Sequence, residues 1–136
     1  MNQIYSKNIL NLNKLLLKIN WKREFPNTIF FRDYEDLPRK SPFDIDIFIE
    51  LSDREKLVKT IIKFAKSNNL LHFIKKTSSY CLILIFDLAK EKKKRNWIFY
   101  ETRSVFYTVK KQELKIKEIS KNYSEGIPTP NPEWSF

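Results

Sequence analysis

Two aspartates that lie two residues apart, Asp44 and Asp46, have the type and spacing that most directly suggest chemistry in this chain. They lie in the stretch SPFDIDIFIE, residues 41–50, whose isoleucines alternate with other residues as in a β-strand. Residues i and i+2 of a strand project from one face, with Cα atoms about 6.5 Å apart, so both carboxylates can reach one cation. Such hard oxygen ligands suit Mg²⁺. The alternative is a solvated sheet face, on which two aspartates are tolerated.

The strand that carries the pair alternates regularly. Its three isoleucines point to one face, and the two aspartates and Phe48 point to the other. A helix is predicted directly after it, because Ser52 to Glu55 reads S-D-R-E, a capping-box pattern. Its buried side would be formed by Leu57, Val58, Ile61, Ile62 and Ala65.

The remaining elements complete an α+β pattern. An amphipathic helix is expected near the N-terminus, over about residues 1–25, and a charged turn at KEKKKRN, 90–96. Strands are predicted at IFFRDY (29–34), LLHFIKK (70–76), CLILIF (81–86) and WIFYETRSVFYTV (97–109), and ELKIKEI (113–119) continues the last strand or forms a hairpin. The continuous apolar run CLILIF is expected to be buried on both faces. The order is α-β-β-α-β-β-β, with antiparallel neighbours and helices covering a face of the sheet.

Composition excludes several kinds of site. A chain of 136 residues with one Cys, one His and one Gly has no intramolecular disulfide, no cysteine-based zinc site and no multi-histidine metal site. A single glycine also excludes the G-x-G-x-x-G and Walker A motifs. We expect one domain over residues 1–136, with an extended, proline-rich tail over 126–136. Any chemistry must use carboxylates, Lys and Arg, hydroxyls and aromatic rings.

The formal net charge of +10 favours polyanionic partners, although a composition rich in Lys, Asn and Ile also arises from an AT-rich genome. No apolar run approaches the roughly 18 residues of a transmembrane helix, and no signal-peptide hydrophobic region is apparent at the N-terminus. We therefore expect a cytoplasmic protein without a membrane span.

The residues around the aspartates form a longer pattern. FFRDYEDLP, residues 30–38, followed by DIDIFIE, 44–50, resembles the R-N-Y-E-x-L-P … S-D-I-D-L-L-V signature of a bacterial subgroup of the DNA polymerase beta-like nucleotidyltransferase superfamily, often associated with surface-polysaccharide gene clusters. Asp33 stands where the pattern has Asn. Downstream, CLILIFDLAKEKKKRNWIFYE, 81–101, is similar to the strand, polar turn and W-L-x-L-D strand of that subgroup.

The resemblance implies a nucleotidyltransferase-like fold with a mixed or antiparallel sheet flanked by helices. It also implies a function, the transfer of a nucleotidyl group from a nucleoside triphosphate to an acceptor hydroxyl. In the superfamily the D-x-D pair and a third carboxylate hold two divalent metals, Mg²⁺ or Mn²⁺. Two residues, Asp87 and Glu101, could supply the third carboxylate. The motif register selects Glu101, where the subgroup has Asp, so Asp44, Asp46 and Glu101 are the expected metal-binding and catalytic residues.

Four further residues are candidates for contacts to the nucleotide phosphates: Arg32, Lys40, Ser41 and Arg103. Arg32 could equally form an ion pair with a neighbouring acid. Arg103 could share the face of Glu101, because it follows two residues later on the same strand.

One departure from the superfamily supports an alternative function. Members usually carry a Gly-Ser pair that cradles the triphosphate, whereas this chain has the loop Pro38-Arg39-Lys40-Ser41-Pro42 at the corresponding place before D-x-D. The alternative is a catalytically degenerate or antitoxin-like binding module that acts through its basic surface on a protein or nucleic-acid partner. A minimal enzyme would need a second copy or a partner subunit to complete its cleft.

Overall fold

The computed structural model describes residues 4–32, 37–39, 45–107, 113–114, 116, 121–124 and 126–130. At the N-terminal end are the helices α1 (Lys7–Lys18) and α2 (Trp21–Glu24), followed by the strands β1 (Thr28–Arg32) and β2 (Ile45–Ile49). Next come the helix α3 (Leu51–Ser67) and the strands β3 (Leu70–Lys76), β4 (Tyr80–Asp87) and β5 (Trp97–Arg103). Four short strands end the order: β6 (Phe106–Tyr107), β7 (Glu113–Leu114), β8 (Lys121–Ser124) and β9 (Ile127–Pro130).

Five strands form one mixed sheet in the order β1-β2-β5-β4-β3. The pairs β1–β2, β3–β4 and β4–β5 are antiparallel, as expected for strands joined by short connections. The pair β2–β5 is parallel, and it places β5 in the middle of the sheet. The predicted α+β class is confirmed, and the parallel pair brings together residues that are far apart in the sequence.

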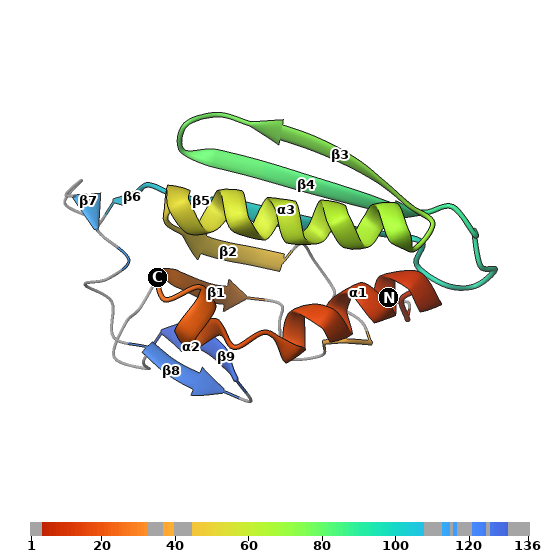
Figure 1. Ribbon diagram of the computed structural model, residues 1–136, viewed down its shortest axis with the longest axis horizontal. Helices are drawn as coiled ribbons and strands as arrows, with labels where there is room; N and C mark the ends of the chain where they lie inside the picture. The colour runs from red at the N-terminus through yellow and green to blue at the C-terminus, as the bar shows by residue number, and fades with distance from the viewer. Residues whose placement is uncertain are drawn as a thin grey trace.

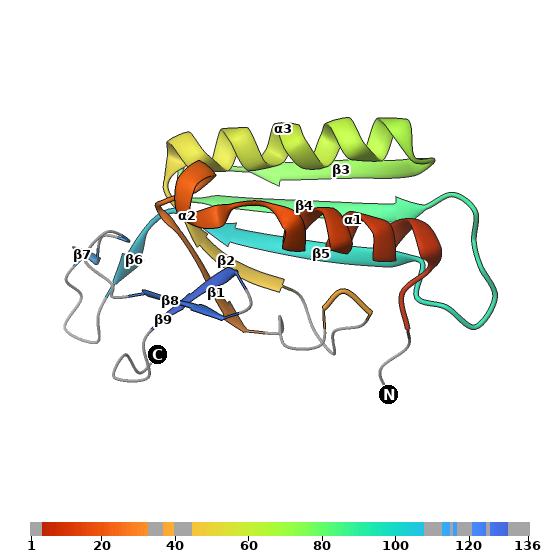
Figure 2. The same cartoon turned by 60° about the horizontal axis from the view of Figure 1, so that its bottom comes forward.

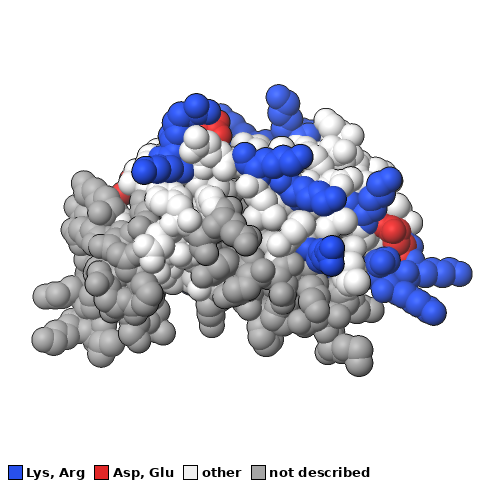
Figure 3. All heavy atoms as spheres, turned by 90° about the horizontal axis from the view of Figure 1, so that it is seen from below, with Lys and Arg blue, Asp and Glu red and all other residues white. Residues whose placement is uncertain are grey.

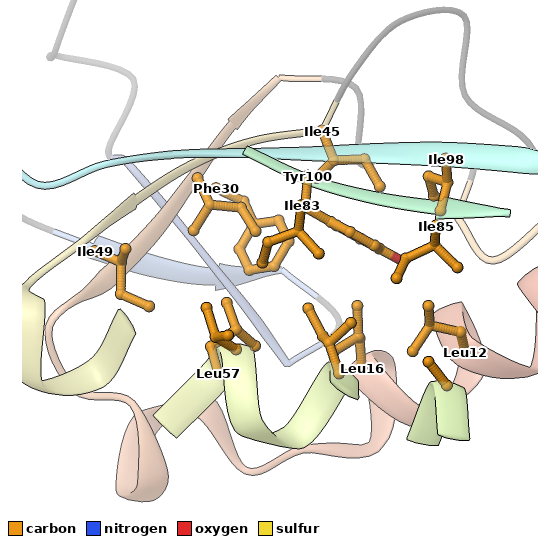
Figure 4. Packing of buried hydrophobic residues seen from close by; sticks show 14 of the residues in the cluster. Leu12, Leu16, Phe30, Ile45, Ile49, Leu57, Ile83, Ile85, Ile98 and Tyr100 are labelled. Atoms are coloured by element: carbon orange, nitrogen blue, oxygen red, sulfur yellow. The ribbon is translucent and has the colours of Figure 1, made fainter. Parts of the chain in front are cut away.

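Both long helices cover the same face of this sheet (Figures 1 and 2). Figure 4 shows Leu12 and Leu16 of α1 and Leu57 of α3 directed toward the sheet. They meet the buried side chains of Ile45 and Ile49 (β2), Phe30 (β1), Ile83 and Ile85 (β4), and Ile98 and Tyr100 (β5). We call this side of the sheet the helix-covered face. The three isoleucines of β2 lie on it, as their alternation predicted.

Polar contacts also attach α1 to the helix-covered face. The hydroxyl of Tyr100 donates to Oδ1 of Asn13 at 2.6 Å, and both side chains are buried. At the C-terminal end of β4, Asp87 accepts hydrogen bonds from the Ser6 hydroxyl at 2.7 Å and from Nδ2 of Asn8 at 3.1 Å. Buried polar groups with such partners fix the position of a helix more specifically than apolar packing alone.

The opposite side of the sheet is the open face, because the described helices pack on one face only. This corrects the prediction that CLILIF is buried on both faces. In β4 the burial alternates: Cys81, Ile83 and Ile85 are buried, whereas Leu82 and Leu84 are only partly buried. The apolar residues on the second face produce a continuous hydrophobic run in the sequence without producing a second buried layer.

The predicted capping box at Ser52 is wrong. Helix α3 begins at Leu51, its N-cap is Glu50, and no side chain caps it. The carboxylate of Asp53 instead accepts a hydrogen bond from the backbone N–H of Asn27 at 3.0 Å, and the N–H of Glu50 donates to the carbonyl of Asn27. A polar side chain of the first turn of α3 therefore bonds to a distant part of the chain, and the helix start itself has no side-chain cap.

The N-terminal region expected as one helix forms two. Helix α1 ends at Lys18, and Asn20 caps α2 by accepting from the N–H of Arg23 at 3.2 Å. The indole N–H of Trp21 donates to the carbonyl of Leu16 at 2.9 Å, which holds the two helices together. Trp21 is almost fully buried and packs against Phe30 with ring centroids 5.0 Å apart.

The C-terminal part adds two small hairpins. Strands β6 and β7 pair with each other, which selects the hairpin from the two possibilities that the sequence allowed for residues 113–119. Strands β8 and β9 form a second hairpin beside β1 (Figure 1). Within the predicted extended tail, residues 127–130 thus form a strand, and residues 131–136 lie outside the described part of the chain.

In the part of the chain that the structure describes, no helix has the length and apolar character needed to cross a bilayer.

Candidate active site

The structure places Asp46 and Glu101 side by side. In the parallel pair of β2 and β5, Asp46 is the register partner of Glu101, and Ile45 is the partner of Tyr100. Neighbouring strands lie about 4.8 Å apart, so the two carboxylates start from adjacent positions in the sheet. Parallel pairing between strands that are separated by a helix and two other strands creates this contact.

Both carboxylates lie on the open face. In β5 the buried residues Ile98, Tyr100 and Thr102 alternate with Phe99 and Glu101, which are less buried. In β2 every residue is buried, but the three isoleucines belong to the core under the helices and Asp46 lies between two of them in the strand, so its side chain points to the other face. The alternation that the sequence predicted for Asp46 is therefore observed, as is the shared face of Glu101 with Trp97 and Phe99.

The two acids are enclosed to different degrees. Asp46 is 9% exposed, whereas the Glu101 side chain is 24% exposed. Next to Asp46 on the open face, Phe48 packs in a small apolar cluster with Ile29 and Ile116, and its ring lies 4.7 Å from that of Phe31. This cluster closes one side of the site and leaves the side of Glu101 more open to solvent.

Two neighbours contact Glu101. The hydroxyl of Tyr80 donates to Oε1 at 3.2 Å, and Nη1 of Arg103 lies 3.6 Å from Oε2. The Arg103 guanidinium also lies over the Tyr80 ring, 5.4 Å from its centroid. The ion pair shows that Arg103 shares the face of Glu101, as predicted. Because Arg103 is 48% exposed, the pair contributes little stability, and its guanidinium is accessible to a ligand.

Two carboxylates at directly opposite positions of adjacent strands carry like charge, and a cation between them would be attracted by both. The site therefore carries the electrostatic feature expected of a divalent-cation ligand pair, although it contains only two described acids. Among the described residues there is no group of three or more His, Cys, Asp or Glu side chains placed to hold a metal.

Asp87, the other candidate for the third carboxylate, lies elsewhere. It ends β4 on the helix-covered face, is buried, and accepts hydrogen bonds from Ser6 and Asn8 of the N-terminal segment and from the N–H of Ala89. Its partners give it a structural role at the end of the strand. The geometry thus favours Glu101, which the motif register also selected.

Several candidate residues fall outside the described part of the chain. Asp44, Lys40 and Ser41 lie there, and of Arg32 only the backbone is described. That backbone is the register partner of Asp46 on the side away from β5. The centre of the predicted site, Asp46 between its two neighbouring strands, is described, whereas the predicted phosphate contacts of residues 40 and 41 are not.

The described part of the β1–β2 connection, residues 37–39, is attached to the N-terminal segment. The carbonyl of Pro38 accepts from Nδ2 of Asn13 at 3.3 Å, and the carbonyl of Arg39 accepts from the N–H of Tyr5 at 2.8 Å. Asn13 thus connects this loop to Tyr100, the residue just before Glu101. These bonds attach residues 38 and 39 to the N-terminal segment and, through Asn13, to the middle of β5.

Sequence reasoning missed Tyr80, which donates to Glu101 and stacks with Arg103. The sequence did contain one indication of this role. Alternate residues of a strand share a face, so Tyr80 lies on the same face as Leu82 and Leu84. The register that brings Tyr80 opposite Arg103 depends on the β4–β5 pairing and is not visible in the sequence.

Comparison of the chain with models of protein families, with curated proteins and with solved structures finds no match. The site must therefore be interpreted from its own geometry and chemistry.

Proposed function

We propose that this chain is a metal-dependent nucleotidyltransferase that transfers a nucleotidyl group from a nucleoside triphosphate to an acceptor hydroxyl. The observation that carries the proposal is the register pairing of Asp46 with Glu101 on adjacent parallel strands of the open face. Two carboxylates that meet in this way can offer their oxygens to one divalent cation. The resemblance of residues 30–50 and 81–101 to nucleotidyltransferase motifs selects this reaction among those that use a metal-binding carboxylate pair.

The residues present suit a hard divalent cation. Asp46 and Glu101 supply carboxylate oxygens, which Mg²⁺ and Mn²⁺ prefer, and Asp44 belongs to the same predicted strand face. When bound, the cations would neutralise triphosphate charge and increase the acidity of the acceptor hydroxyl. Asp46, Glu101 and Asp44 are therefore the proposed ligands.

In the proposed reaction the acceptor oxygen forms a bond to the α-phosphorus while the bond from that phosphorus to the bridging oxygen breaks. Pyrophosphate leaves with the electron pair of that bond. The hydroxyl proton passes to the carboxylate of Asp46 or Glu101 and from there to water. Arg103, which faces Glu101 and is half exposed, would contact a phosphate, as would Arg32, Lys40 and Ser41.

The second candidate is a binding module that uses the same fold without catalysis. The chain has no Gly-Ser pair before β2, and its helical side is basic. Lys and Arg side chains gather over much of the surface seen in Figure 3, with few Asp and Glu side chains among them. Exposed members on α1, α2 and α3 are Lys7, Lys14, Lys18, Lys22, Arg23, Lys56, Lys59, Lys63 and Lys66. This surface would bind a polyanion whether or not the carboxylates react.

Metal binding distinguishes the two candidates. Mn²⁺ titration, followed by electron paramagnetic resonance with a non-hydrolysable nucleoside triphosphate present, should show saturable binding to the wild type. Asp46→Asn and Glu101→Gln should each weaken it at least about tenfold, a reduction typical of a site losing one of its few ligands. Glu55→Gln, which removes an exposed carboxylate from α3, is the matched control and should bind Mn²⁺ as the wild type does.

The reaction itself is tested with a nucleoside triphosphate labelled at the α-phosphate, by following transfer of the label to an acceptor hydroxyl together with release of unlabelled pyrophosphate. Asp46→Asn should lower the rate roughly 10²–10³-fold, the usual effect of removing one electrostatic contact to a transition state. Equal Mn²⁺ affinity in Asp46→Asn and wild type would refute the metal site. If Asp46→Asn loses Mn²⁺ binding but the wild type transfers no nucleotidyl group, the binding module is favoured.

A further inference from the structure

The open face of β3, β4 and β5 is a surface of aromatic and aliphatic side chains. Strand register aligns them in two rows across the sheet. The first row holds Trp97, Phe86 and Leu71, and the second holds Phe99, Leu84 and Phe73. We call these six side chains the aromatic platform. Four of the six are aromatic, and they come from three neighbouring strands.

Much of the aromatic platform is accessible. Phe73 is 53% exposed, Leu71 is 42% exposed and Trp97 is 37% exposed. The rings are arranged in contact: Phe73 lies edge-on to Phe86 with centroids 6.0 Å apart, and the centroids of Trp97 and Phe99 are 5.1 Å apart. Contiguous apolar patches of this kind on a soluble protein mark interaction sites more often than chance exposure does.

Cations surround the aromatic platform. In the next rows toward the C-terminal end of β5 lie Lys75, which is exposed, and Arg103. Beyond the opposite end of β5, the turn after β4 carries four exposed lysines: Lys90, Lys92, Lys93 and Lys94. The turn projects past the end of the sheet in both ribbon views (Figures 1 and 2).

Arg95 connects the lysine turn to the aromatic platform. Its guanidinium lies over the Trp97 ring, 3.8 Å from the centroid, and over the Tyr5 ring at 5.5 Å. The Arg95 side chain is buried, so its charge holds the indole in place. The remaining surface of Trp97 is presented to solvent in a fixed orientation.

We propose that the aromatic platform binds single-stranded nucleic acid. Unpaired bases stack on exposed aromatic side chains of a sheet face, while Lys and Arg at the margins contact phosphates. Two rows spaced about 7 Å apart along the strands give room for bases at successive positions. The rings of the aromatic platform suit the flat bases of a single-stranded nucleic acid, and the cations beyond its two ends suit the phosphates.

Charge argues against a second copy of the chain as the occupant. Each copy carries a net charge of +10, and face-to-face packing would bring Lys75, Arg103 and the lysine turn of both copies close together. Like charges at an interface oppose association. A polyanion is attracted by the same groups, and its bases supply the flat apolar surface that the rings require.

The aromatic platform leads directly to the carboxylate pair. On the open face of β5 the side chains follow one another as Trp97, Phe99, Glu101 and Arg103. A nucleic-acid strand whose bases stack on Trp97 and Phe99 would therefore bring its terminal hydroxyl about 7 Å further along the sheet, at Glu101. Its role as acceptor of the nucleotidyl group rests on the proposed function, whereas its binding to the aromatic platform does not.

Binding is measured by fluorescence anisotropy with a labelled oligonucleotide of about ten unpaired residues, as RNA and as DNA, without metal or nucleotide. Trp97→Ala and Phe73→Ala should each raise the dissociation constant roughly 5- to 150-fold, the range for loss of one base-stacking ring. Tyr123→Ala removes an aromatic ring of similar exposure, 37%, from β8, and is the matched control with unchanged affinity.

Two further variants separate stacking from general apolar contact. Trp97→Phe should keep most of the affinity, whereas Trp97→Leu should lose most of it, because only the former retains a flat ring. The same oligonucleotide in duplex form should bind more weakly, because its bases are not available for stacking. Circular dichroism should show that the variants remain folded, since Phe73 is 53% exposed and Trp97 lies at the surface of the sheet with 37% of its area exposed.

Charge on the two sides of the sheet provides a second test. Lys75→Gln should weaken binding and reduce the dependence of affinity on salt by about one phosphate contact, whereas Lys63→Gln on α3 should not, although it changes the net charge equally. The proposal is overturned if Lys63→Gln and Lys59→Gln weaken binding while Trp97→Ala does not, because the helices would then be the polyanion site.

Analytical ultracentrifugation provides the third test. A wild-type dimer that Phe73→Asp converts to a monomer, with no oligonucleotide bound by either species, would show that a second copy covers the platform. Nucleotidyl transfer without oligonucleotide binding would refute the platform proposal alone, and oligonucleotide binding without any transfer would refute the proposed function alone.

Discussion

The two faces of the five-stranded sheet are made from alternating residues of the same strands, and they differ in almost every physical property. On the helix-covered face, aliphatic side chains pack against α1 and α3, and the buried polar groups of Asn13 and Tyr100 bind each other. On the open face, aromatic rings stay exposed and two acids lie side by side. The first arrangement gains stability from burial, and the second keeps reactive and flat surfaces accessible.

Neighbouring residues of β4 give the largest expected contrast. Ile83→Ala should lower the free energy of unfolding by about 2–5 kcal/mol, because it leaves a cavity between the sheet and the helices. Leu84→Ala, one residue along on the open face, should lower it by about 1 kcal/mol or less. Urea denaturation of both variants measures the difference. Equal losses would mean that the open face is also a packed core.

Two tyrosines allow the same contrast for hydrogen bonds. Tyr100→Phe removes the donor to the buried Asn13 Oδ1 and should lower the free energy of unfolding by about 1–3 kcal/mol. Tyr80→Phe removes the donor to Glu101, which water can replace at this partly exposed site, so about 0.5 kcal/mol is expected. Thermal or urea unfolding compares them, and a larger loss for Tyr80→Phe would contradict the assignment of the two faces.

The helix-covered face should also make the protein sensitive to alkali. Burial raises the pKa of Tyr100 well above its usual value of 10.0 and raises the pKa of the Cys81 thiol above 9.0. A raised pKa in the folded state adds stability that is complete below the pKa of the unfolded chain. That stability is lost as the pH rises from there toward the folded pKa, by at most about 1.4 kcal/mol per pH unit for each group.

Tyr100→Phe isolates the tyrosine contribution to this pH dependence. The stability difference between wild type and Tyr100→Phe should be constant below the tyrosine pKa of the unfolded chain and should narrow above it. Urea midpoints from about pH 8 to pH 11 measure this difference across the unfolded tyrosine pKa. A difference that stays constant over the whole range would show that the Tyr100 pKa is not raised by burial.

The carboxylate pair should give the smallest effect. Asp46→Asn removes one of two opposite like charges, keeps the size of the side chain, and should change the stability of the metal-free protein by less than about 1 kcal/mol. Mg²⁺ should then stabilise the wild type and have little effect on the variant. A thermal shift assay with and without Mg²⁺ tests both statements, with Glu55→Gln as the control. A strongly destabilised Asp46→Asn would indicate that Asp46 is a structural residue.

Local patterns predicted much of this contrast. The alternation in FDIDIFIE assigned the isoleucines to the core and Asp46 to the other face, and the amphipathic pattern near the N-terminus indicated a helix where α1 lies. These predictions succeed because side-chain direction in a strand or helix follows from backbone periodicity alone. A local pattern failed at the start of α3, where the capping box predicted at Ser52 is absent, the helix begins at Leu51 without a side-chain cap, and Asp53 binds Asn27 instead.

By itself, the sequence determined the α+β class, the face to which β2 directs its isoleucines and Asp46, and the absence of glycine-rich, disulfide and cysteine–zinc chemistry. Only the tertiary structure decided which strands are neighbours. It inserted β5 between β2 and β4, which placed Glu101 beside Asp46 and left Asp87 on the other face. It also placed both helices on one face, which left the aromatic platform uncovered. Strand order depends on how all the apolar surfaces pack together, and no local pattern contains that information.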